Sequence, residues 1–315
     1  MENLRLADQK ASKDKGDQYG VQLFNKNKEA NLLKLHLMLK NKTYTTSAYK
    51  TFTLYDPKKR EISSLPYFPD RIVHHAAMIP LEPVFVSTFT ADTYSCIKRK
   101  GIHPAVRYVK KALQDVPGTQ YCLKLDIKKF YPSIDHKILK QLLRRKIKDK
   151  DQLWLLDNII DSAPGVPIGN YLSQYFANFY LAYFDHWIKE NKGVKYYLRY
   201  ADDMIFLSGS KEYLHKLLAD IREYLLLELN LSLKDNYQIF PVDARGIDIL
   251  GYVFRHKYVR LRKRLKKNFA RAVARNDYAA ITSYYGWAIP CNSKHLLKKL
   301  SHGNEKFQRL WNRAA

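Results

Sequence analysis

The sequence Tyr-Ala-Asp-Asp at residues 200–203 places two adjacent carboxylates between two short runs of apolar and aromatic residues. Runs of this length, separated by a polar pair, predict two antiparallel strands joined by a tight turn, with Asp202 and Asp203 at its tip. Neighbouring carboxylates repel each other unless a cation lies between them, and hard oxygen ligands of this kind suit Mg²⁺. Because Asp-Asp is also a common turn dipeptide, the hairpin by itself fits a solvated turn equally well.

A third acidic residue favours the metal-binding interpretation. Residues 121–126 have the pattern of a strand that ends on Asp126, and a basic, aromatic turn follows. One carboxylate at a strand end and two on a hairpin can converge on two metal ions about 3.5 to 4 Å apart, which is the arrangement used for in-line phosphoryl transfer. The pair of segments therefore predicts polymerase chemistry.

The charge of the chain indicates a polyanionic partner. Lys and Arg number 55 against 30 Asp and Glu, which gives a formal net charge of +25 and a sequence pI of about 9.7. Nucleic acid is favoured over an acidic membrane surface, since no run approaches the roughly 18 apolar residues of a spanning helix. The cysteines, Cys96, Cys122 and Cys291, are odd in number and far apart, so we expect neither disulfides nor a zinc knuckle, and a cytoplasmic location.

The strand ending on Asp126 and the acidic hairpin resemble motifs A and C of reverse transcriptases, whose hairpin reads Tyr-x-Asp-Asp. The resemblance covers nearly the whole chain and implies an α+β right-hand polymerase, with an antiparallel palm sheet flanked by helices. It assigns residues 1–104 to the fingers, with a further fingers segment near 137–164. Residues 105–255 would form the palm with motifs A to E, and residues 256–315 a helical, basic thumb.

The resemblance implies two Mg²⁺ ions, for which Mn²⁺ can substitute. Asp126, Asp202 and Asp203 would be the catalytic and metal-binding residues, and the carbonyl of Ile127 would complete one coordination shell. One ion would lower the pKa of the primer 3′-hydroxyl, while the other would neutralise the triphosphate and the leaving pyrophosphate.

Nucleotide binding is assigned to two basic segments and a lysine. Residues 49–62 predict a hairpin whose basic tip would meet the triphosphate or lie solvated. Backbone N–H groups after Asp126 would donate to the triphosphate, and Tyr131 matches the aromatic residue that excludes a ribose 2′-hydroxyl, with core packing as the alternative. Lys234, on a strand predicted at 231–234, would lie near the leaving pyrophosphate or be solvated. The full set is Lys58, Lys59, Arg60, Lys128, Lys129, Phe130, Tyr131 and Lys234.

Apolar spacing predicts the helices that surround these motifs. Helical repeats cover residues 28–40, 102–113, 137–161, 172–187 and 211–228, and a further hairpin is expected at 247–254. In the resemblance that hairpin carries the primer grip, Gly251 and Tyr252.

The thumb segment is the most basic part of the chain. Residues 256–315 contain fifteen Lys and Arg but only two acidic residues, Asp277 and Glu305, so their net charge is +13. Apolar residues in this segment repeat with helical spacing. Two or three helices with a basic side would track the phosphate backbone. The candidates are Arg262, Lys263, Arg264, Lys266 and Lys267.

One motif narrows the subclass. Most reverse transcriptases read Gln-Gly-x-x-x-Ser-Pro where this chain reads Ile-Gly-Asn-Tyr-Leu-Ser-Gln at residues 168–174. Enzymes of diversity-generating retroelements have an aliphatic residue in place of the first Gln and Gln in place of Pro, and this chain is similar to them in both. Small residues at 169, 173 and 177 would let a base pair approach the backbone. The template and fidelity candidates are Ile168, Gly169, Asn170, Ser173 and Gln174.

The expected function is RNA-templated DNA synthesis that is error-prone at template adenines. The implied partners are a template-repeat RNA, a DNA or RNA primer, dNTPs and a small accessory variability protein, with no membrane. Another bacterial reverse transcriptase of the retron-like, group II intron-like or abortive-infection type is the first alternative. A catalytically silent RNA-binding scaffold is the second, and it is opposed by the retention of all three carboxylates.

Overall fold

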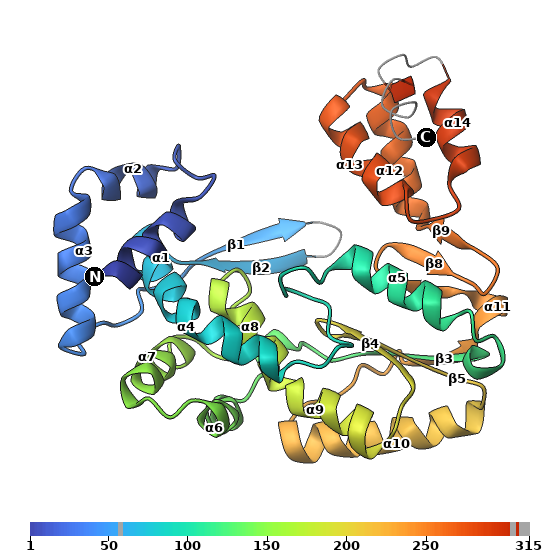
Figure 1. The fold of residues 1–315 in the computed structure, drawn as a ribbon, viewed down its shortest axis with the longest axis horizontal. Coiled ribbons are helices and arrows are strands. Elements are labelled where there is room, and N and C mark those ends of the chain that lie inside the picture. Colours follow the sequence, from blue (N-terminus) through green and yellow to red (C-terminus); the bar gives the residue numbers. More distant parts are fainter. Residues whose placement is uncertain (56–58, 303–306, 309–315) are drawn as a thin grey trace. The chain divides into compact units, whose positions relative to one another are not determined.

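The computed structural model describes residues 1–55, 59–302 and 307–308 of the 315-residue chain (Figure 1). The chain divides into two compact units. The first contains residues 1–93, 127–192 and 222–232, and the second contains the remainder. Over the described ranges, no helix combines the length and the apolar character that crossing a membrane requires.

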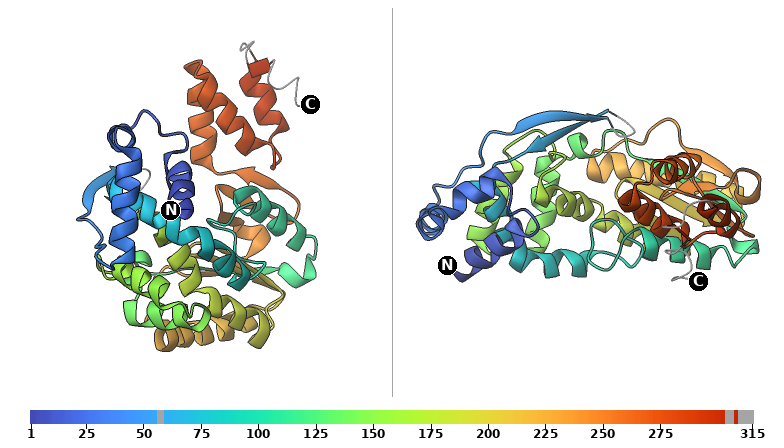
Figure 2. Two further views of the ribbon diagram at one scale, coloured as in Figure 1. Left: turned by 60° about the vertical axis from the view of Figure 1, so that its left-hand side comes forward. Right: turned by 90° about the horizontal axis from the view of Figure 1, so that it is seen from above.

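The first unit is mostly helical and carries one hairpin. It contains α1 (Glu2–Ser12), α2 (Tyr19–Asn25), α3 (Lys28–Lys40), β1 (Lys50–Tyr55), β2 (Lys59–Ser64), α4 (Ile72–Thr88), α6 (His136–Lys146), α7 (Lys150–Ile160), α8 (Tyr171–Tyr180) and α9 (Ala182–His186). Helix α4 packs against α1 and α8, and Phe85 of α4 contacts the rings of Phe176 and Phe179. Figure 2 shows α1, α2, α3 and α4 gathered at the N-terminal part of this unit. The predicted helix at 28–40 and the hairpin of residues 49–62 are confirmed by α3 and by the antiparallel pairing of β1 with β2.

Two predicted helices are each divided in the structure. Residues 137–161 form α6 and α7 rather than one helix, because the backbone leaves the helical region at Ile147 and the side chain of Asp149 caps the second helix by accepting from the N–H of Gln152 over 2.7 Å. Residues 172–187 likewise divide at Leu181 into α8 and α9. In both cases apolar spacing alone did not reveal the break.

The second unit is built on two antiparallel sheets. The first has the strand order β4 (Tyr196–Tyr200), β5 (Asp203–Ser208), β3 (Tyr121–Asp126), β6 (Gln238–Pro241), and the second has the order β7 (Ile247–Ile249), β8 (Tyr252–Phe254), β9 (Val259–Leu261). The helices are α5 (Ile102–Ala112), α11 (Val242–Arg245), α12 (Lys263–Ala274), α13 (Tyr278–Ala288) and α14 (Lys294–Ser301), and α10 (Lys211–Leu229) begins in this unit and ends in the first.

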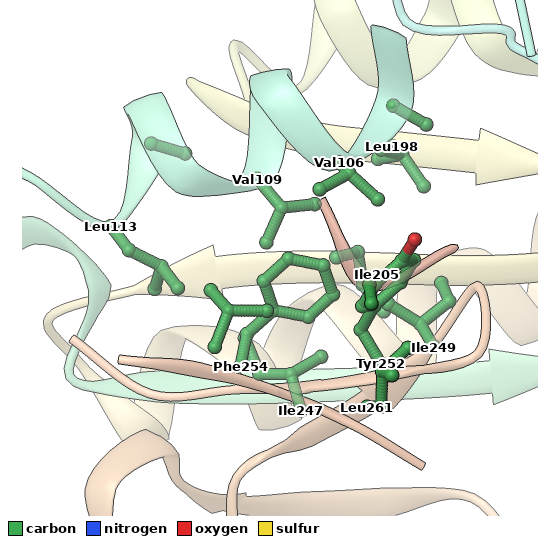
Figure 3. Close-up of a cluster of buried hydrophobic side chains, with 14 of the residues drawn as sticks. Val106, Val109, Leu113, Leu198, Ile205, Ile247, Ile249, Tyr252, Phe254 and Leu261 are labelled. Atoms are coloured by element: carbon green, nitrogen blue, oxygen red, sulfur yellow. The ribbon is translucent and has the colours of Figure 1, made fainter. Parts of the chain in front are cut away.

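A single hydrophobic core joins α5 to both sheets (Figure 3). Val106 and Val109 of α5 lie against Ile205 of β5, and Tyr252 and Phe254 of β8 complete the cluster. All five side chains are buried, and burying an aliphatic or aromatic side chain of this size contributes about 1.5 to 3 kcal/mol. This core therefore anchors β5, the strand that begins with Asp203.

The C-terminal helices form the predicted helical segment. Helices α12, α13 and α14 lie together (Figure 2). Their side chains Phe269, Ile281, Tyr285 and Leu297 are buried. The expectation of two or three helices after residue 256 is confirmed by these three, counted over the described residues.

The prediction of a strand at residues 231–234 is wrong. Only an isolated bridge forms at Leu233, and the strand that pairs with β3 begins four residues after Lys234, at Gln238. The reason is local: the N–H of Lys234 donates to the carbonyl of Asp126, so this segment crosses the end of β3 before the chain turns to pair with it. The compact unit that contains the N-terminal helices also includes residues 127–192.

Candidate active site

The acidic hairpin is formed by β4 and β5, whose register places Tyr200 opposite Asp203. Ala201 and Asp202 therefore form a two-residue turn, and Ala201 has a φ of +56°, a left-handed conformation that favours glycine. The fully buried Arg199 donates from its guanidinium to the carbonyl of Ala201 over 3.1 Å. A non-glycine residue keeps such a conformation only where its surroundings hold it, so Arg199 supports the turn that carries the acids.

The structure brings the three predicted acids together. Asp126, the last residue of β3, lies directly opposite Asp203 of β5, and residues so paired project to the same face. Burial, and to a lesser extent the negative charge of Asp126, raise the pKa of Asp202 to about 6. The pKa of Asp203 is also raised, chiefly by burial. These carboxylates thus experience the mutual repulsion that a bound cation would relieve.

Lys234 is bound to the acidic site. Its N–H donates to the carbonyl of Asp126 over 2.9 Å, and its Nζ donates to Oδ2 of the same residue over 2.5 Å. The sequence placed this lysine near the leaving pyrophosphate or in solvent. In the structure it is the direct ion-pair partner of Asp126.

The residues present fit divalent metal binding. All three acids supply hard oxygen ligands, and Oδ1 of Asp126 is buried without a hydrogen-bond partner. Within the part of the chain that the structure describes, no three His, Cys, Asp or Glu side chains are already arranged to hold a metal ion. The donors are therefore in place, while the ion pair of Lys234 with Asp126 occupies part of the site. Ile127 is buried and belongs to the first unit.

The predicted primer-grip residues form the turn between β7 and β8. Leu250 and Gly251 both have positive φ, +57° and +84°, as a tight two-residue hairpin turn requires. A Cβ on Gly251 would lie 2.7 Å from the ring of Trp287 in α13. The ring of Tyr252 is fully buried, and its hydroxyl donates to the carbonyl of Trp287 over 2.8 Å. The side chain of Tyr252 therefore fixes α13 to the sheet.

The cationic candidates of the thumb differ in their surroundings. Arg262 is paired with Asp248, with 2.5 Å between Nη2 and Oδ1, and its N–H donates to the carbonyl of Gly251. Lys263, Arg264 and Lys267 are exposed on α12, and Lys266 is half-buried. Arg262 thus ties the start of α12 to the β7–β8 turn, while the others present the basic surface.

The nucleotide-binding candidates after Asp126 lie in the first unit. Lys128 and Lys129 are exposed, but the N–H of Lys128 already donates to the carbonyl of Ser232 over 2.9 Å. Its backbone therefore does not offer the free donor that we expected. Phe130 is a core residue with 2% of its surface exposed. Tyr131 is half-buried and packs edge-on against Phe130.

The hairpin candidates lie on β2. Lys59 and Arg60 are exposed and pair with Tyr55 and Leu54 of β1. Lys58 falls outside the described residues.

The loop that carries the fidelity candidates is joined to this hairpin. The N–H of Ser63 in β2 donates to the carbonyl of Ile168 over 2.7 Å. Gly169 has a φ of +109°, and a Cβ there would lie 2.6 Å from the carbonyl oxygen of Ser63. Ile168 itself is half-buried. The backbone at 168–169 and the strand β2 are therefore positioned by each other.

The other residues of this motif separate into buried and exposed positions. Gly169 and Gln174 are exposed, whereas Asn170, Ser173 and Ala177 are buried. The expected open face of small residues is therefore limited to Gly169, because Ser173 and Ala177 are covered in this structure.

A buried polar cluster lies beneath the loop. The carboxylate of Asp70 accepts from the hydroxyl of Tyr44 over 2.7 Å, and the amide of Asn170 donates to the hydroxyl of Tyr49 over 3.1 Å. Asn170 stands at the N-cap of α8 but makes no capping bond with its side chain. His74, which is 1% exposed, lies one helical turn after Asp70. The sequence signal for this cluster is the pair of polar residues four apart, Asp70 and His74, which the motifs alone did not assign to the site.

Because of His74, we expect the stability of the folded protein to decrease at acid pH. Burial lowers the pKa of His74 to about 4, so its imidazole is neutral in the folded protein at pH 7. The unfolded chain, with a histidine pKa of about 6.5, takes up a proton first as the pH falls. The stability that this residue contributes is therefore fully present above about pH 6.5 and is lost toward pH 4, with a slope of up to about 1.4 kcal/mol per pH unit.

Urea unfolding between pH 7 and pH 4.5 measures this effect. We expect His74→Gln to flatten the decline in the free energy of unfolding, while His103→Gln, at an exposed position, leaves it unchanged. Equal slopes in both variants would show that His74 is not the group responsible.

Comparisons with known proteins agree with this geometry. The chain is 24% identical over 283 residues to protein YkfC of Escherichia coli, which covers 74% of this chain and 73% of that protein. It is 25% identical over 177 residues to the group II intron-encoded protein LtrA of Lactococcus lactis, which covers 52% of this chain but only 29% of LtrA.

Solved structures share the fold. A telomerase from Candida albicans in complex with a telomeric RNA fragment aligns with a TM-score of 0.53 and 12% identity, over 87% of this chain and 58% of that one. A truncated apo telomerase from Candida tropicalis aligns with a TM-score of 0.52 and 15% identity, over 75% of this chain and 60% of that one. The sequence profile described as reverse transcriptase (RNA-dependent DNA polymerase) matches residues 55–254, more than half of the chain. The strand ending on Asp126 and the hairpin of Asp202 and Asp203 lie within that match, and the chain belongs to the reverse transcriptase family.

Proposed function

We propose that this RNA-directed DNA polymerase is the reverse transcriptase of a diversity-generating retroelement, and that it copies a template-repeat RNA into cDNA with errors at template adenines. The observation that carries this proposal is Ile168, an aliphatic residue before Gly169 where most of the family has Gln. Gln174, in place of the usual Pro, supports the same subclass.

The position of Ile168 gives the substitution a physical consequence. Its carbonyl is held by the N–H of Ser63, so the backbone of the loop is fixed to the hairpin that carries Lys59 and Arg60. Its side chain can neither donate nor accept a hydrogen bond, whereas an amide in its place could hold a templating base in register. Since a factor of ten in discrimination corresponds to about 1.4 kcal/mol, the loss of one polar contact is enough to raise the error rate.

Metal binding is the second part of the proposal. Asp126 and Asp202 would hold two Mg²⁺ ions, or Mn²⁺, with Asp203 and the carbonyl of Ile127 in support. When bound, these ions would lower the pKa of the primer 3′-hydroxyl and neutralise the triphosphate. Asp126 supplies a buried oxygen that lacks a hydrogen-bond partner. The pKa of Asp202 is raised by burial and then by the charge of Asp126, and a bound cation would relieve that second contribution.

The other residues are assigned to binding of the nucleotide, the primer and the phosphate backbone. Lys59, Arg60, Lys128 and Lys129 are exposed cations suited to the triphosphate, and Lys58 is assigned with them. Tyr131 would exclude ribonucleotides. The β7–β8 turn at Gly251 would contact the primer. The basic surface of α12, with Lys263, Arg264, Lys266 and Lys267, would follow the phosphate backbone.

The partners follow from this function. The chain would act on a template-repeat RNA, a DNA or RNA primer and dNTPs, together with a small accessory variability protein. Similarity to LtrA favours one alternative, an enzyme of the group II intron type. The two functions differ in the expected error spectrum.

The Ile168→Gln variant tests the proposal. We expect the natural enzyme to misincorporate mainly at template adenines, and Ile168→Gln to lower that rate about tenfold while extension is largely preserved. Sequencing of cDNA made by both proteins on one RNA template measures the rates. Uniform, low error in the natural enzyme would reject the diversity-generating function and leave an ordinary reverse transcriptase.

A further inference from the structure

We propose that Lys234 is a built-in counter-cation of the acidic site, which a divalent metal ion must displace from Asp126 in order to bind. This inference rests on the proposed metal-binding role of the three aspartates. It concerns the enzyme before nucleotide binds, and it predicts that the free enzyme holds its metal ions weakly.

The geometry shows that the contact is built into the fold. Lys234 is attached to Asp126 at two points, since its N–H donates to the carbonyl and its Nζ donates to Oδ2. The backbone hydrogen bond holds the Cα of Lys234 next to the end of β3, so its ammonium can reach the carboxylate of Asp126. The side chains of Lys234 and Asp126 are only 34% and 24% exposed, so this ion pair is shielded more than a surface pair.

The charges explain why a cation is needed there. Asp126 and Asp203 face each other across β3 and β5, and Asp202 follows at the tip of the turn. Three carboxylates without a cation would repel one another strongly in a partly buried site. The ammonium of Lys234 offsets one of these charges, so the sheet can form before any metal ion is present.

The same contact competes with a metal ion. An ammonium 2.5 Å from Oδ2 of Asp126 occupies the position from which Mg²⁺, with its demand for ligands at about 2.0 to 2.1 Å, would approach that oxygen. Oδ1 is buried and has no partner, so it is left as a metal ligand. Binding through both oxygens therefore requires Lys234 to move, and the anionic triphosphate offers the displaced ammonium a new partner.

Mn²⁺ binding to the full-length, nucleotide-free protein, followed by electron paramagnetic resonance, tests this proposal. We expect Lys234→Met to bind Mn²⁺ about tenfold more tightly than the natural protein, because a competing positive charge is removed. The matched control is Lys124→Met. Lys124 lies on β3 two residues before Asp126, but its Nζ donates to the carbonyl of Asp248 over 2.6 Å. Its loss should change the affinity less than about threefold, since it removes a nearby charge without freeing the carboxylate.

The alternatives give different results. Equal affinity in the natural protein and Lys234→Met, or equal gains in both lysine variants, would overturn the counter-cation role. If Asp126→Asn binds Mn²⁺ as well as the natural protein does, the metal-binding role of the aspartates fails as well. This variant therefore distinguishes a failure of the proposed metal site from a failure of the counter-cation role of Lys234. Lys234→Gln, which keeps a hydrogen-bond donor without the charge, should reproduce the gain and replaces Lys234→Met if that variant does not fold.

A second readout comes from residual primer extension. The Mg²⁺ concentration that gives half-maximal extension should fall in Lys234→Met, even if the maximal rate also falls. An increase in that concentration would contradict the proposal.

Discussion

Replacing Asp202 and Asp203 together with asparagine is expected to abolish primer extension on an RNA template while RNA binding survives. The change removes two of the three carboxylates at the end of the β3–β5 pair and leaves the exposed cations of α12 untouched. Metal ions contribute several kcal/mol to the stabilisation of charge in phosphoryl transfer, so the rate should fall about a thousandfold or more.

The same variant should be more stable than the natural protein at neutral pH. Burial raises the pKa of Asp202 to about 6, so the folded state binds a proton more readily than the unfolded state, and stability declines as the pH rises from about 4 to 6. Asparagine does not ionise, and the decline that Asp202 causes disappears. Thermal unfolding at pH 7 and at pH 4 measures the difference.

Extension and RNA binding by the double variant should be compared with those of the natural enzyme. Undiminished extension would refute the catalytic role of the acids. A parallel loss of RNA binding and of stability would instead show that the hairpin no longer folds.

The sequence predicts the strands that carry these acids well because they have a strong local signal. The apolar runs on either side of Asp202 and Asp203 and the strand before Asp126 are confirmed as β4, β5 and β3. Each strand is short and mostly apolar, and the acids stand at the end of β3, in the turn after β4 and at the start of β5. Pairing between the strands then follows from the need to bury both apolar faces.

The sequence could not predict the contacts that link distant segments. Lys234 lies 108 residues after Asp126 and was placed on a strand that does not form, so the ion pair between them had no local signature. Arg199 was counted within an apolar run, although a charged residue in the middle of such a strand indicates a buried partner. Phe130 was assigned to nucleotide binding from its place in a motif, whereas its burial depends on the tertiary fold.

The loop at residues 165–170 shows the same limit. Its glycines and proline predict a turn, but the sequence does not reveal that the turn meets β2, about a hundred residues earlier. The hydrogen bonds from Ser63 to Ile168 and from Asn170 to Tyr49 both depend on packing within the first unit.

Gly169→Ala is the second change for which we expect a large effect. The residue has a φ of +109°, which an alanine adopts only at a cost of about 1 to 3 kcal/mol. A Cβ there would also lie 2.6 Å from the carbonyl oxygen of Ser63 and 2.8 Å from Cγ2 of Ile62. The first of these is a backbone atom, so relief of the contact requires β2 to move away from the loop.

That movement should break the hydrogen bond between Ser63 and Ile168 and displace the strand that carries Lys59 and Arg60. We expect kcat/KM for a correct dNTP to fall at least about tenfold, which corresponds to about 1.4 kcal/mol of lost transition-state stabilisation. Single-nucleotide extension kinetics measure this, together with thermal unfolding of the same proteins.

Gly193→Ala is the matched control for backbone strain. Gly193 also has a positive φ, +61°, but a Cβ there would meet no atom within 4 Å. Both variants should lose stability through strain, whereas only Gly169→Ala should lose nucleotide selection and kcat/KM. If the two variants behave alike in extension, the contact between the loop and β2 has no role in nucleotide binding. A loss confined to Gly169→Ala would instead show that the hairpin and the Ile168 loop act as one unit on the incoming nucleotide.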